Sequence, residues 1–476
     1  MSRLVHERPS IRRIHHSSVL APGRNCMAAP VVRRAAVLID GEAYFTRLAQ
    51  CLRRAQKSVF IIGWDFDAGI MLEPGPGGVP LGDLLRSLVE LRPGLEVRVL
   101  VWSMAVVHAP GASWPLLAGA EWQQHPRIKV KLDRRHPIYA CHHQKMVCID
   151  DQIAFVGGLD LTVGRWDAPE HRHEERRRTN PDGTPYGPVH DVQIAVDGAV
   201  ARMLAGVARQ RWSRATGERV GWVTAAGDLW PPDLAPDFEH VPVAISRTEP
   251  AWRGQPAVYE SVQLMVDALR AAERFIYIES QYFSSQRVGH LLCELLARPS
   301  GPEVVVVTGL SARGAIERYV MGNNRERLAR SLRAADRHGR FRIYYPVVPS
   351  QEGASALKLH SKLMVVDDRL LRIGSSNLNN RSEGLDTECD LAVEAADAAS
   401  RAAIARVRNG LLSEHIGADP AAFAAAVDRE GSLVRAVELL GHEGRALREL
   451  RAVARRGSTR PVLGTGLFDP GAPFLR

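Results

Sequence analysis

The chain contains two copies of one short pattern, and this repeat constrains the fold more than any other feature. The copies read HHQKMVCIDDQIAFVGGLDL from His142 and LHSKLMVVDDRLLRIGSSNL from Leu359. An offset of 217 positions (360 − 143) relates His143 to His360, Lys145 to Lys362, Asp150 to Asp367, Gly157 to Gly374 and Asp160 to Asn377. One His-x-Lys-x4-Asp match is a weak signal, but two in gapless register indicate a duplicated chain.

The repeat extends upstream of both motifs. KSVFIIGWDFD (57–67) parallels ERFIYIESQYF (273–283), and each follows an amphipathic stretch of helical period. Buried-strand runs come next, EVRVLVW and EVVVVTGL, and the motif segments themselves alternate as strands. Strands that alternate with helices predict an α/β fold. We therefore expect two pseudo-symmetric α/β sandwich halves, each a mixed sheet flanked by helices, with one active site at their interface.

Composition shifts along the chain predict the domain limits. A stretch rich in Pro and Asp, TAAGDLWPPDLAPDFEHVP, suggests a connection between the halves. Residues 433–456 read as one amphipathic helix with an arginine-rich face, expected to pack on the catalytic domain or to lie on an anionic membrane. The predicted segments are an N-terminal extension (1–30), a first half (31–223), a linker (224–250), a second half (251–400) and a helical C-terminal extension (401–476).

Bulk composition excludes several classes of protein. No run approaches the roughly 20 apolar residues of a membrane-spanning helix, and the basic N-terminus lacks the apolar core of a signal peptide. Six scattered cysteines without a CxxC pair suit reduced thiols. We expect a cytoplasmic or peripheral membrane protein, with export by a specialised secretion route as the alternative. The net charge of +9 favours an anionic partner, either a phospholipid surface or nucleic acid.

Lysine is rare in this chain, and its placement points to the motifs. Only six of the 62 basic residues are lysines, and two of them, Lys145 and Lys362, follow a motif histidine by two positions. A phosphodiester needs its oxygens neutralised, a nucleophile, and an acid for the leaving alkoxide. Imidazole can supply nucleophile and acid near neutral pH, and a compact ammonium can hold phosphate. Side chains at i and i+2 of a strand share a face, so each His-Lys pair points the same way.

Three further segments carry a family resemblance. RWDAPEH (165–171), TPYGPVHDVQIAVDG (184–198) and IESQYF (278–283), together with the paired motifs, resemble the eukaryotic-type branch of the phospholipase D superfamily, which also occurs in bacteria. The resemblance implies a covalent phosphohistidine mechanism. His143 would attack phosphorus and His360 would protonate the leaving alcohol, then activate water or another alcohol. The two histidines could also exchange these roles.

The resemblance assigns roles to the remaining residues. Lys145 and Lys362 would hold the phosphate, assisted by Asn377 and Ser376. Asp191 and Glu388 occupy equivalent places before a strand, and each would orient the histidine of the opposite half. The motif aspartates, Asp150 and Asp367, are expected to make structural hydrogen bonds. Asp160 replaces Asn377 in the first half, and its role stays open because a carboxylate is a poor phosphate ligand.

Each assignment has a structural alternative. The His and Lys residues could be exposed strand positions, the two carboxylates could form structural ion pairs, and Asn377 could be a turn residue. CHH (141–143) and HRHEERRR (171–178) offer histidines without a full ligand set at metal spacing, so no metal and no cofactor is expected. Four aromatic residues could line the site or belong to the core: Trp64, Trp166, Tyr282 and Phe283.

Three functions remain. The first is phospholipase D action on glycerophospholipids, by hydrolysis or transphosphatidylation. The second keeps the chemistry and changes the substrate: phosphatidyl transfer as in cardiolipin synthases, which commonly carry N-terminal membrane helices, or nuclease action, which often uses single-motif chains that dimerise. The third is an inactive lipid-binding scaffold, which predicts damaged motifs. We expect a monomer that meets phospholipid at a membrane surface and not nucleic acid. No motif specifies the headgroup.

Overall fold

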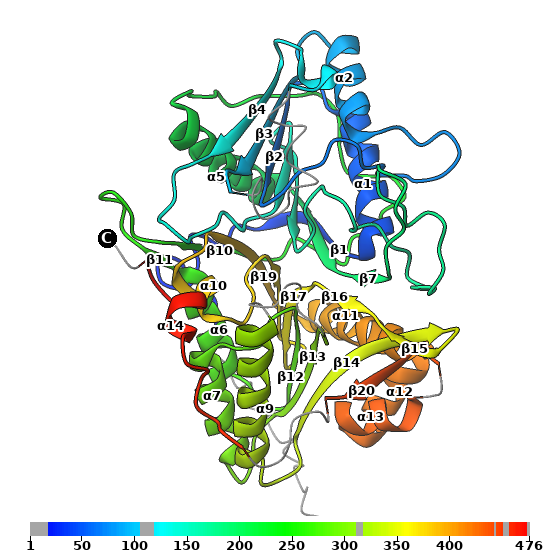
Figure 1. Ribbon diagram of the computed structural model, residues 1–476, viewed down its shortest axis with the longest axis vertical. Helices are drawn as coiled ribbons and strands as arrows, with labels where there is room; N and C mark the ends of the chain where they lie inside the picture. The colour runs from blue at the N-terminus through cyan, green and yellow to red at the C-terminus, as the bar shows by residue number, and fades with distance from the viewer. Residues whose placement is uncertain (1–17, 105–118, 311–317, 442–443, 451–456, 474–476) are drawn as a thin grey trace, which may run out of the picture.

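The computed structural model describes residues 18–104, 119–310, 318–441, 444–450 and 457–473. Its two halves each contain one large mixed sheet (Figure 1), with the first half above the second in that view. The predicted fold of two pseudo-symmetric α/β halves is confirmed.

The first sheet has eight strands, and its order departs from the order along the chain. Strands β2, β3 and β4 are parallel to one another, and the remaining neighbours are antiparallel. Across the sheet the strands are β4 (Ile128–Asp133), β3 (Glu96–Trp102), β2 (Ser58–Gly63), β5 (Met146–Ile149), β6 (Ile153–Gly157), β8 (Val192–Asp197), β1 (Val32–Ile39) and β9 (Phe238–Glu239).

The second sheet repeats this order over seven strands, and its eighth strand (Val258–Tyr259) takes the edge position of β9 although it lies early in its half and β9 lies late. It adds β15 (Gly353–Ala356) beyond one end, and β20 (Ala446–Glu449) pairs with its β14. The matching strands are β14 (Phe341–Ser350), β13 (Glu303–Thr308), β12 (Phe275–Ser280), β17 (Lys362–Val366), β18 (Leu370–Gly374), β19 (Glu388–Glu394), β10 (Val243–Glu249) and β11 (Val258–Tyr259). The motif strands β5 and β17 therefore occupy equivalent places.

Helices cover the outer faces of both sheets. In the first half these are α1 (Asp40–Arg54) and α2 (Leu81–Leu91), and in the second half α6 (Glu260–Arg270), α7 (Gln286–Ala297) and α9 (Asn323–Ala335). Helix α5 (Gly198–Thr216) follows β8, and α11 (Ala398–Ile416) follows β19, so these two are also counterparts. The shorter elements are η1 (Glu121–Gln123), η2 (Arg318–Gly322), α10 (Asn380–Gly384), α12 (Pro420–Glu430), α13 (Leu433–Leu440) and α14 (Thr465–Phe468).

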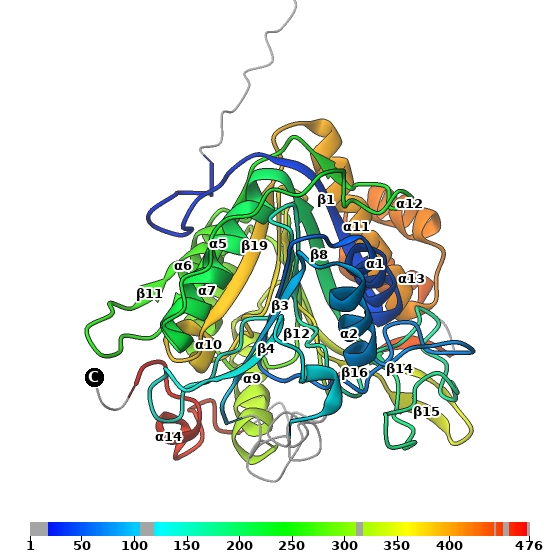
Figure 2. The same cartoon turned by 90° about the horizontal axis from the view of Figure 1, so that it is seen from above.

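Each half has a hydrophobic core between its sheet and its outer helices, and a third, inner core joins the two halves. Alternating side chains of β2 divide between cores: Val59 and Ile61 face α1 and α2, while Phe60 and Ile62 face the inner core. This inner core contains residues from both sheets and from α5 and α11. Seen from above (Figure 2), α12 and α13 lie to one side of the molecule and α6 and α7 to the other. Burial on both faces explains the nearly continuous apolar strand runs.

The structure differs from the predicted domain limits at the N-terminal extension, at the linker and at the C-terminal extension. The predicted linker (224–250) contains β9, which pairs with β1, and β10, which pairs with β19, so it contributes a strand to each sheet. Residues 1–17 of the predicted N-terminal extension lie outside the described residues. From residue 18 the extension packs on the second half, where Met27 N donates to Ile245 O at 2.7 Å.

The predicted limit between residues 400 and 401 falls inside α11, which belongs to the second half as the counterpart of α5. The predicted helix over 433–456 is also wrong in its second part. Helix α13 ends at Leu440, before Gly441, and Ala446–Glu449 instead pairs antiparallel with β14. Gly444, with φ of 117°, adopts a conformation that a helix does not allow. Residues 442–443 and 451–456 of that prediction lie outside the described residues.

Within the described ranges, no helix is long and apolar enough to cross a membrane. The six cysteines are free thiols, as the sequence predicts.

Candidate active site

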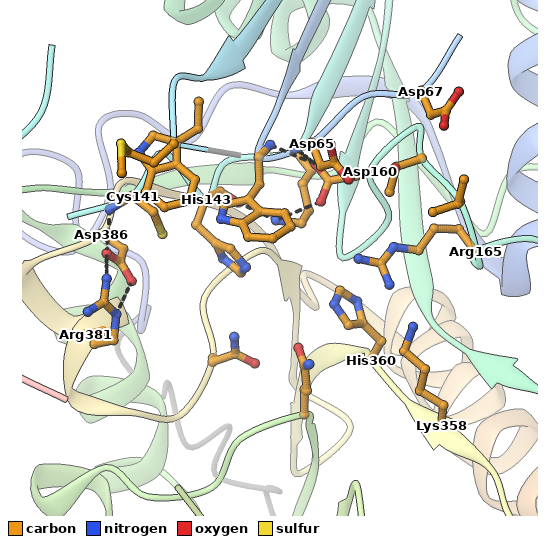
Figure 3. Close-up of a pocket in the computed structure, with 18 of the residues that line it drawn as sticks. Asp65, Asp67, Cys141, His143, Asp160, Arg165, Lys358, His360, Arg381 and Asp386 are labelled. Atoms are coloured by element: carbon orange, nitrogen blue, oxygen red, sulfur yellow. Dashed lines mark hydrogen bonds and ion pairs between the residues drawn. The ribbon is translucent and has the colours of Figure 1, made fainter. Parts of the chain in front are cut away.

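The two motif histidines stand directly before equivalent strands and face one cavity. His143 precedes β5 and His360 precedes β17. Figure 3 shows their rings on opposite sides of the same space. The backbone of each is held by the other half: His143 N donates to Thr387 O at 2.9 Å, and His360 N donates to His190 O at 2.8 Å. The halves therefore position each other's histidine.

Each histidine also contacts a buried carboxylate of the opposite half. His143 Nδ1 lies 3.0 Å from Glu388 Oε2, and Glu388 begins β19. His360 Nδ1 lies 2.6 Å from Asp191 Oδ2, and Asp191 precedes β8. These are the reciprocal pairs that the resemblance implies. A carboxylate on Nδ1 leaves Nε2 as the free nitrogen of a neutral imidazole, which is the arrangement a nucleophile or base requires.

The motif lysines lie beside the histidines. Lys145 Nζ donates to His143 O at 2.8 Å and lies 3.4 Å from Asp160 Oδ2. Asp160 therefore has a defined contact, as the partner of a buried lysine. Lys362 Nζ donates to Gln281 Oε1 at 3.2 Å and lies 3.1 Å from His360 Nδ1.

Burial and positive neighbours shift the pKa values of these groups. Burial, followed by the charges of Lys145 and Lys362, holds the pKa of His143 well below its usual value. Burial, then Lys362 and Arg165, does the same to the pKa of His360. Both imidazoles are therefore neutral near pH 7 in the unliganded site. Burial also lowers the pKa of Lys362 to about 7, while it raises the pKa of Glu388 well above its usual value.

Two cations beside His360 were not named among the predicted site residues. Figure 3 shows Arg165 and Lys358 flanking its ring at the cavity wall. Arg165 is buried, and no carboxylate pairs with it among the described residues. Arg165 is the first residue of the RWDAPEH segment and Lys358 is one of the six lysines, so both belong to sequence features described above. Gln281, in IESQYF, also lines the cavity.

Of the four predicted phosphate ligands, Lys145 and Asn377 line the cavity, whereas Lys362 and Ser376 are not among its lining residues. Asn377 lines the cavity, and its side-chain oxygen has no hydrogen-bond partner among the described residues. Ser376 is a correction. Its hydroxyl donates to Asp390 Oδ2 at 2.7 Å and its backbone N–H donates to Asp390 Oδ1 at 3.1 Å, so Ser376 faces β19 rather than the cavity.

The motif aspartates stabilise the chain entering the sheet. Asp150 accepts backbone N–H groups of Gln56, Lys57 and Ser58 at 2.6–2.7 Å. Asp367 accepts the equivalent three, from Glu273, Arg274 and Phe275, at 2.6–2.8 Å. These contacts fit the structural role expected for both aspartates.

The cavity has a volume of about 1790 Å³ and combines cations with aromatic walls. Trp64 and Tyr282 line it, while Trp166 and Phe283 are buried in the core, so the four aromatic candidates divide evenly. Lys145, Arg165, Lys358 and two neutral imidazoles around one space can hold a phosphate anion, attack it and exchange protons with it.

Comparison with known proteins supports the duplicated arrangement. The family model described as Phospholipase D matches residues 51–225. The model described as Cardiolipin synthase, PLD-like domain, matches residues 265–405. Each match contains one His-x-Lys-x4-Asp motif.

Curated relatives resemble the chain at low identity. Phospholipase D A of Dictyostelium discoideum is 24% identical over 421 residues, covering 72% of this chain and 31% of that protein. Phospholipase D alpha 4 of Arabidopsis thaliana is 24% identical over 497 residues, covering 77% of this chain and 62% of that protein. The chain thus spans less than two thirds of the length of these relatives.

A solved structure shares the fold. The phosphatidylserine synthase of Haemophilus influenzae Rd KW20 superposes with a TM-score of 0.56 at 15% identity, covering 80% of this chain and 88% of that chain. This likeness concerns the fold. The two family matches and the curated relatives, together with the duplicated motifs, identify the chain as a phosphodiesterase of the phospholipase D superfamily, with two phospholipase D domains.

Proposed function

We propose that the protein is a phospholipase D-type enzyme that cleaves glycerophospholipids through a phosphohistidine intermediate. The products are phosphatidate and the free headgroup alcohol, or a new phospholipid when an alcohol replaces water. The observation that carries this proposal is the reciprocal pair of histidine–carboxylate contacts, His143–Glu388 and His360–Asp191, which face one cation-lined cavity.

In the first step, Nε2 of neutral His143 attacks phosphorus and the bond from phosphorus to the headgroup oxygen breaks. His360, protonated once the anionic substrate is bound, gives its proton to the leaving alkoxide. The Nδ1–H of His143 donates to Glu388, which stabilises the positive imidazole of the intermediate. Exposure favours this order, because the His143 side chain is 16% exposed and that of His360 is 6% exposed.

In the second step, His360 accepts a proton from water or an alcohol, whose oxygen attacks phosphorus and releases His143. Lys145 and Asn377, which line the cavity, hold the non-bridging oxygens throughout. Lys362 adds its charge from beside His360, and Arg165 and Lys358 add positive charge at the cavity wall. No step requires a metal or another cofactor.

The cavity dimensions favour a lipid substrate. Its volume of about 1790 Å³ exceeds the range of about 300–1000 Å³ of ordinary small-molecule pockets. Trp64, Trp102, Trp122 and Tyr282 give its walls large apolar surfaces, on which glycerol and the first acyl carbons can pack. We propose that a monomer meets this substrate at a membrane surface and that nucleic acid is not its substrate.

A second candidate is phosphatidyl transfer to a biosynthetic acceptor. Two observations favour it: residues 265–405 match the model described as Cardiolipin synthase, PLD-like domain, and the fold resembles a phosphatidylserine synthase. Both candidates share the phosphatidyl-enzyme and differ in the alcohol that enters the second step.

The test incubates the purified chain with mixed phospholipid vesicles and a primary alcohol. We expect phosphatidyl-alcohol and phosphatidate from the wild type, and neither from His143→Ala or His360→Ala. His338→Ala, at an exposed histidine, is the matched control and should keep full activity. Adding glycerol, serine and phosphatidylglycerol as competing acceptors separates the candidates, because a synthase prefers one of them to water. Absence of any lipid product, with His143-dependent cleavage of DNA, would refute the lipid assignment.

A further inference from the structure

A second group of buried titratable side chains lies behind Asp191, outside the catalytic cavity. Asp40 begins α1, His171 ends the RWDAPEH segment, His190 lies in β7 (Val189–His190), and Glu414 lies on α11. Their potential ligand atoms all lie within 4.8 Å of one another. None of the four lines the cavity. Three come from the first half and one from the second.

The distances between these atoms have the values of a four-coordinate metal site. His190 Nδ1 lies 3.0 Å from Asp40 Oδ1 and 3.2 Å from Glu414 Oε1. His171 Nε2 lies 3.3 Å from Asp40 Oδ2 and 3.2 Å from Glu414 Oε1. Ligands at about 2.1 Å from a tetrahedral ion lie about 3.4 Å apart. Four histidine–carboxylate distances thus suit such an ion, with Asp40 meeting each histidine through a different oxygen, and all the potential ligand atoms lie within 4.8 Å of one another.

Hydrogen bonding does not account for all of these contacts. Asp40 is fully buried, yet neither of its carboxylate oxygens accepts a hydrogen bond from the described residues, and His190 Nδ1 also makes none. The oxygens lie close to the ring nitrogens but away from the direction in which an N–H would point. Metal coordination produces this geometry, because nitrogen and oxygen both aim at a common centre rather than at each other.

The outer ring nitrogens of both histidines are held by carboxylates. His171 Nδ1 lies 2.8 Å from Asp167 Oδ2, and His190 Nε2 lies 3.0 Å from Glu279 Oε2. A carboxylate on one nitrogen fixes the tautomer and leaves a lone pair on the other, as in most metal-bound histidines. Here the free lone pairs are those that face Asp40 and Glu414.

The charge balance of the cluster also calls for a dication. Four buried or nearly buried carboxylates meet here: Asp40, Glu414, Asp167 and Glu279. Two arginines compensate two of them, since Arg178 lies 2.8 Å from Asp167 and Arg445 lies 3.6 Å from Glu414. With His415, whose Nε2 lies 2.9 Å from Glu279 Oε1, counted as neutral, two negative charges remain. One divalent ion would neutralise them with His171 and His190 neutral. The competing account places a proton on each histidine instead.

We infer that Asp40, His171, His190 and Glu414 form a closed, four-coordinate structural site for a divalent transition metal of the zinc type. Two nitrogen and two oxygen ligands with no open position suit zinc in a structural role. The ion would join α11 of the second half to the first half. It would also brace the catalytic pair, since Asp40 N donates to Asp191 O at 2.8 Å and His190 precedes Asp191.

The test measures bound metal in the full chain, purified without a histidine tag or chelator from zinc-supplemented medium. We expect about one equivalent of zinc by mass spectrometry, and less than a tenth of that in Asp40→Asn. His142→Asn is the matched control: it breaks a buried His–Asp pair, with His142 Nε2 3.2 Å from Asp133 Oδ2, outside the cluster, and should keep its zinc.

Wild-type measurements make the test independent of how the variants fold. Cobalt supplied in place of zinc should give the intense visible absorption of a tetrahedral site, and prolonged chelation should lower the thermal unfolding midpoint until zinc restores it. Wild-type protein without stoichiometric metal, whose unfolding midpoint is unaffected by added zinc, would overturn the proposal and assign the two positive charges to histidine protons.

Discussion

Replacing Glu388 by Gln should inactivate the first chemical step without unfolding the protein. Glu388 is fully buried and receives hydrogen bonds from His143 Nδ1 at 3.0 Å, Ser382 Oγ at 2.7 Å and Ser375 Oγ. Gln keeps the shape but removes the charge that stabilises the positive imidazole of the intermediate. Two unit charges about 4 Å apart interact by about 4 kcal/mol at an effective dielectric constant of about 20. The expected loss in kcat is therefore about 10³-fold.

The assay follows release of headgroup alcohol and trapping of the covalent phosphatidyl-enzyme after an acid quench. Glu388→Gln should form the intermediate slowly, whereas Asp191→Asn, which alters the pair of His360, should accumulate it. Ser382→Ala is the matched control, because it removes one donor to Glu388 and leaves the charge. A loss of about tenfold is expected there. Glu388→Gln with more than a tenth of wild-type kcat would refute the electrostatic argument, and accumulation in Glu388→Gln would exchange the roles of the histidines.

Three further perturbations have outcomes that the structure fixes in sign. The pKa of Lys362 is lowered to about 7, so its ammonium is present below that pH and is lost above it. We therefore expect kcat/KM to fall as the pH rises through 7, and a flat profile to pH 9 would contradict this. Gly158→Ala places a Cβ 2.1 Å from Asp191 Oδ1 and so displaces the carboxylate that orients His360. Turnover should be abolished while the circular dichroism spectrum is unchanged, and turnover at the wild-type rate would refute the clash. Arg372→Met removes the cation that pairs with buried Asp390, whose Oδ2 lies 2.7 Å from Arg372. The free energy of unfolding, measured by chemical denaturation, should fall by about 3–5 kcal/mol, and a fall of less than about 1 kcal/mol would contradict this.

Fold class and motif placement were predictable because the repeat has no gaps over the central motif strands, which are buried on both faces. The offset of 217 positions holds over two complete strands and their turn, so β5–β6 and β17–β18 had to be equivalent. Glu388, the first residue of β19, and Asp191, the residue before β8, were also identified, and the family resemblance assigned each of them to the histidine of the opposite half. Local periodicity and the internal register carried the prediction of the strands and motifs. The offset between Asp191 and Glu388 is 197 (388 − 191) rather than 217, so these two lie outside the register.

Residues outside the repeat register were harder to place. Strand β10 was assigned to a linker, because its sequence, VAISRTE, has only a short apolar run and follows a Pro-rich stretch. Strand β20 was assigned to a helix, because ALRE has strong helix formers and only its pairing with β14 makes it a strand. Ser376 was named with its neighbour Asn377, but its hydroxyl and backbone N–H both bond to Asp390 of β19. Each error arose where a tertiary contact overrides a local preference.

The four residues of the proposed metal site could not be grouped from the sequence at all. Asp40, His171, His190 and Glu414 are spread over more than 370 positions (414 − 40), and no local spacing relates them. HRHEERRR contributes only His171, so the segment alone lacks a ligand set. The cluster exists only because α11 returns to the first half after completing the second sheet.

The contacts between the halves explain why two domains are needed for one reaction. Each motif supplies a histidine, but the backbone partner and the carboxylate of that histidine both come from the other half, through Thr387 and Glu388 or through His190 and Asp191. A single half would therefore present an imidazole whose ring orientation and tautomer are not fixed. The inner core contains side chains from both sheets, so separating the halves would also expose a continuous apolar surface. Catalysis and stability thus depend on the same interface, and substitutions there should affect both together.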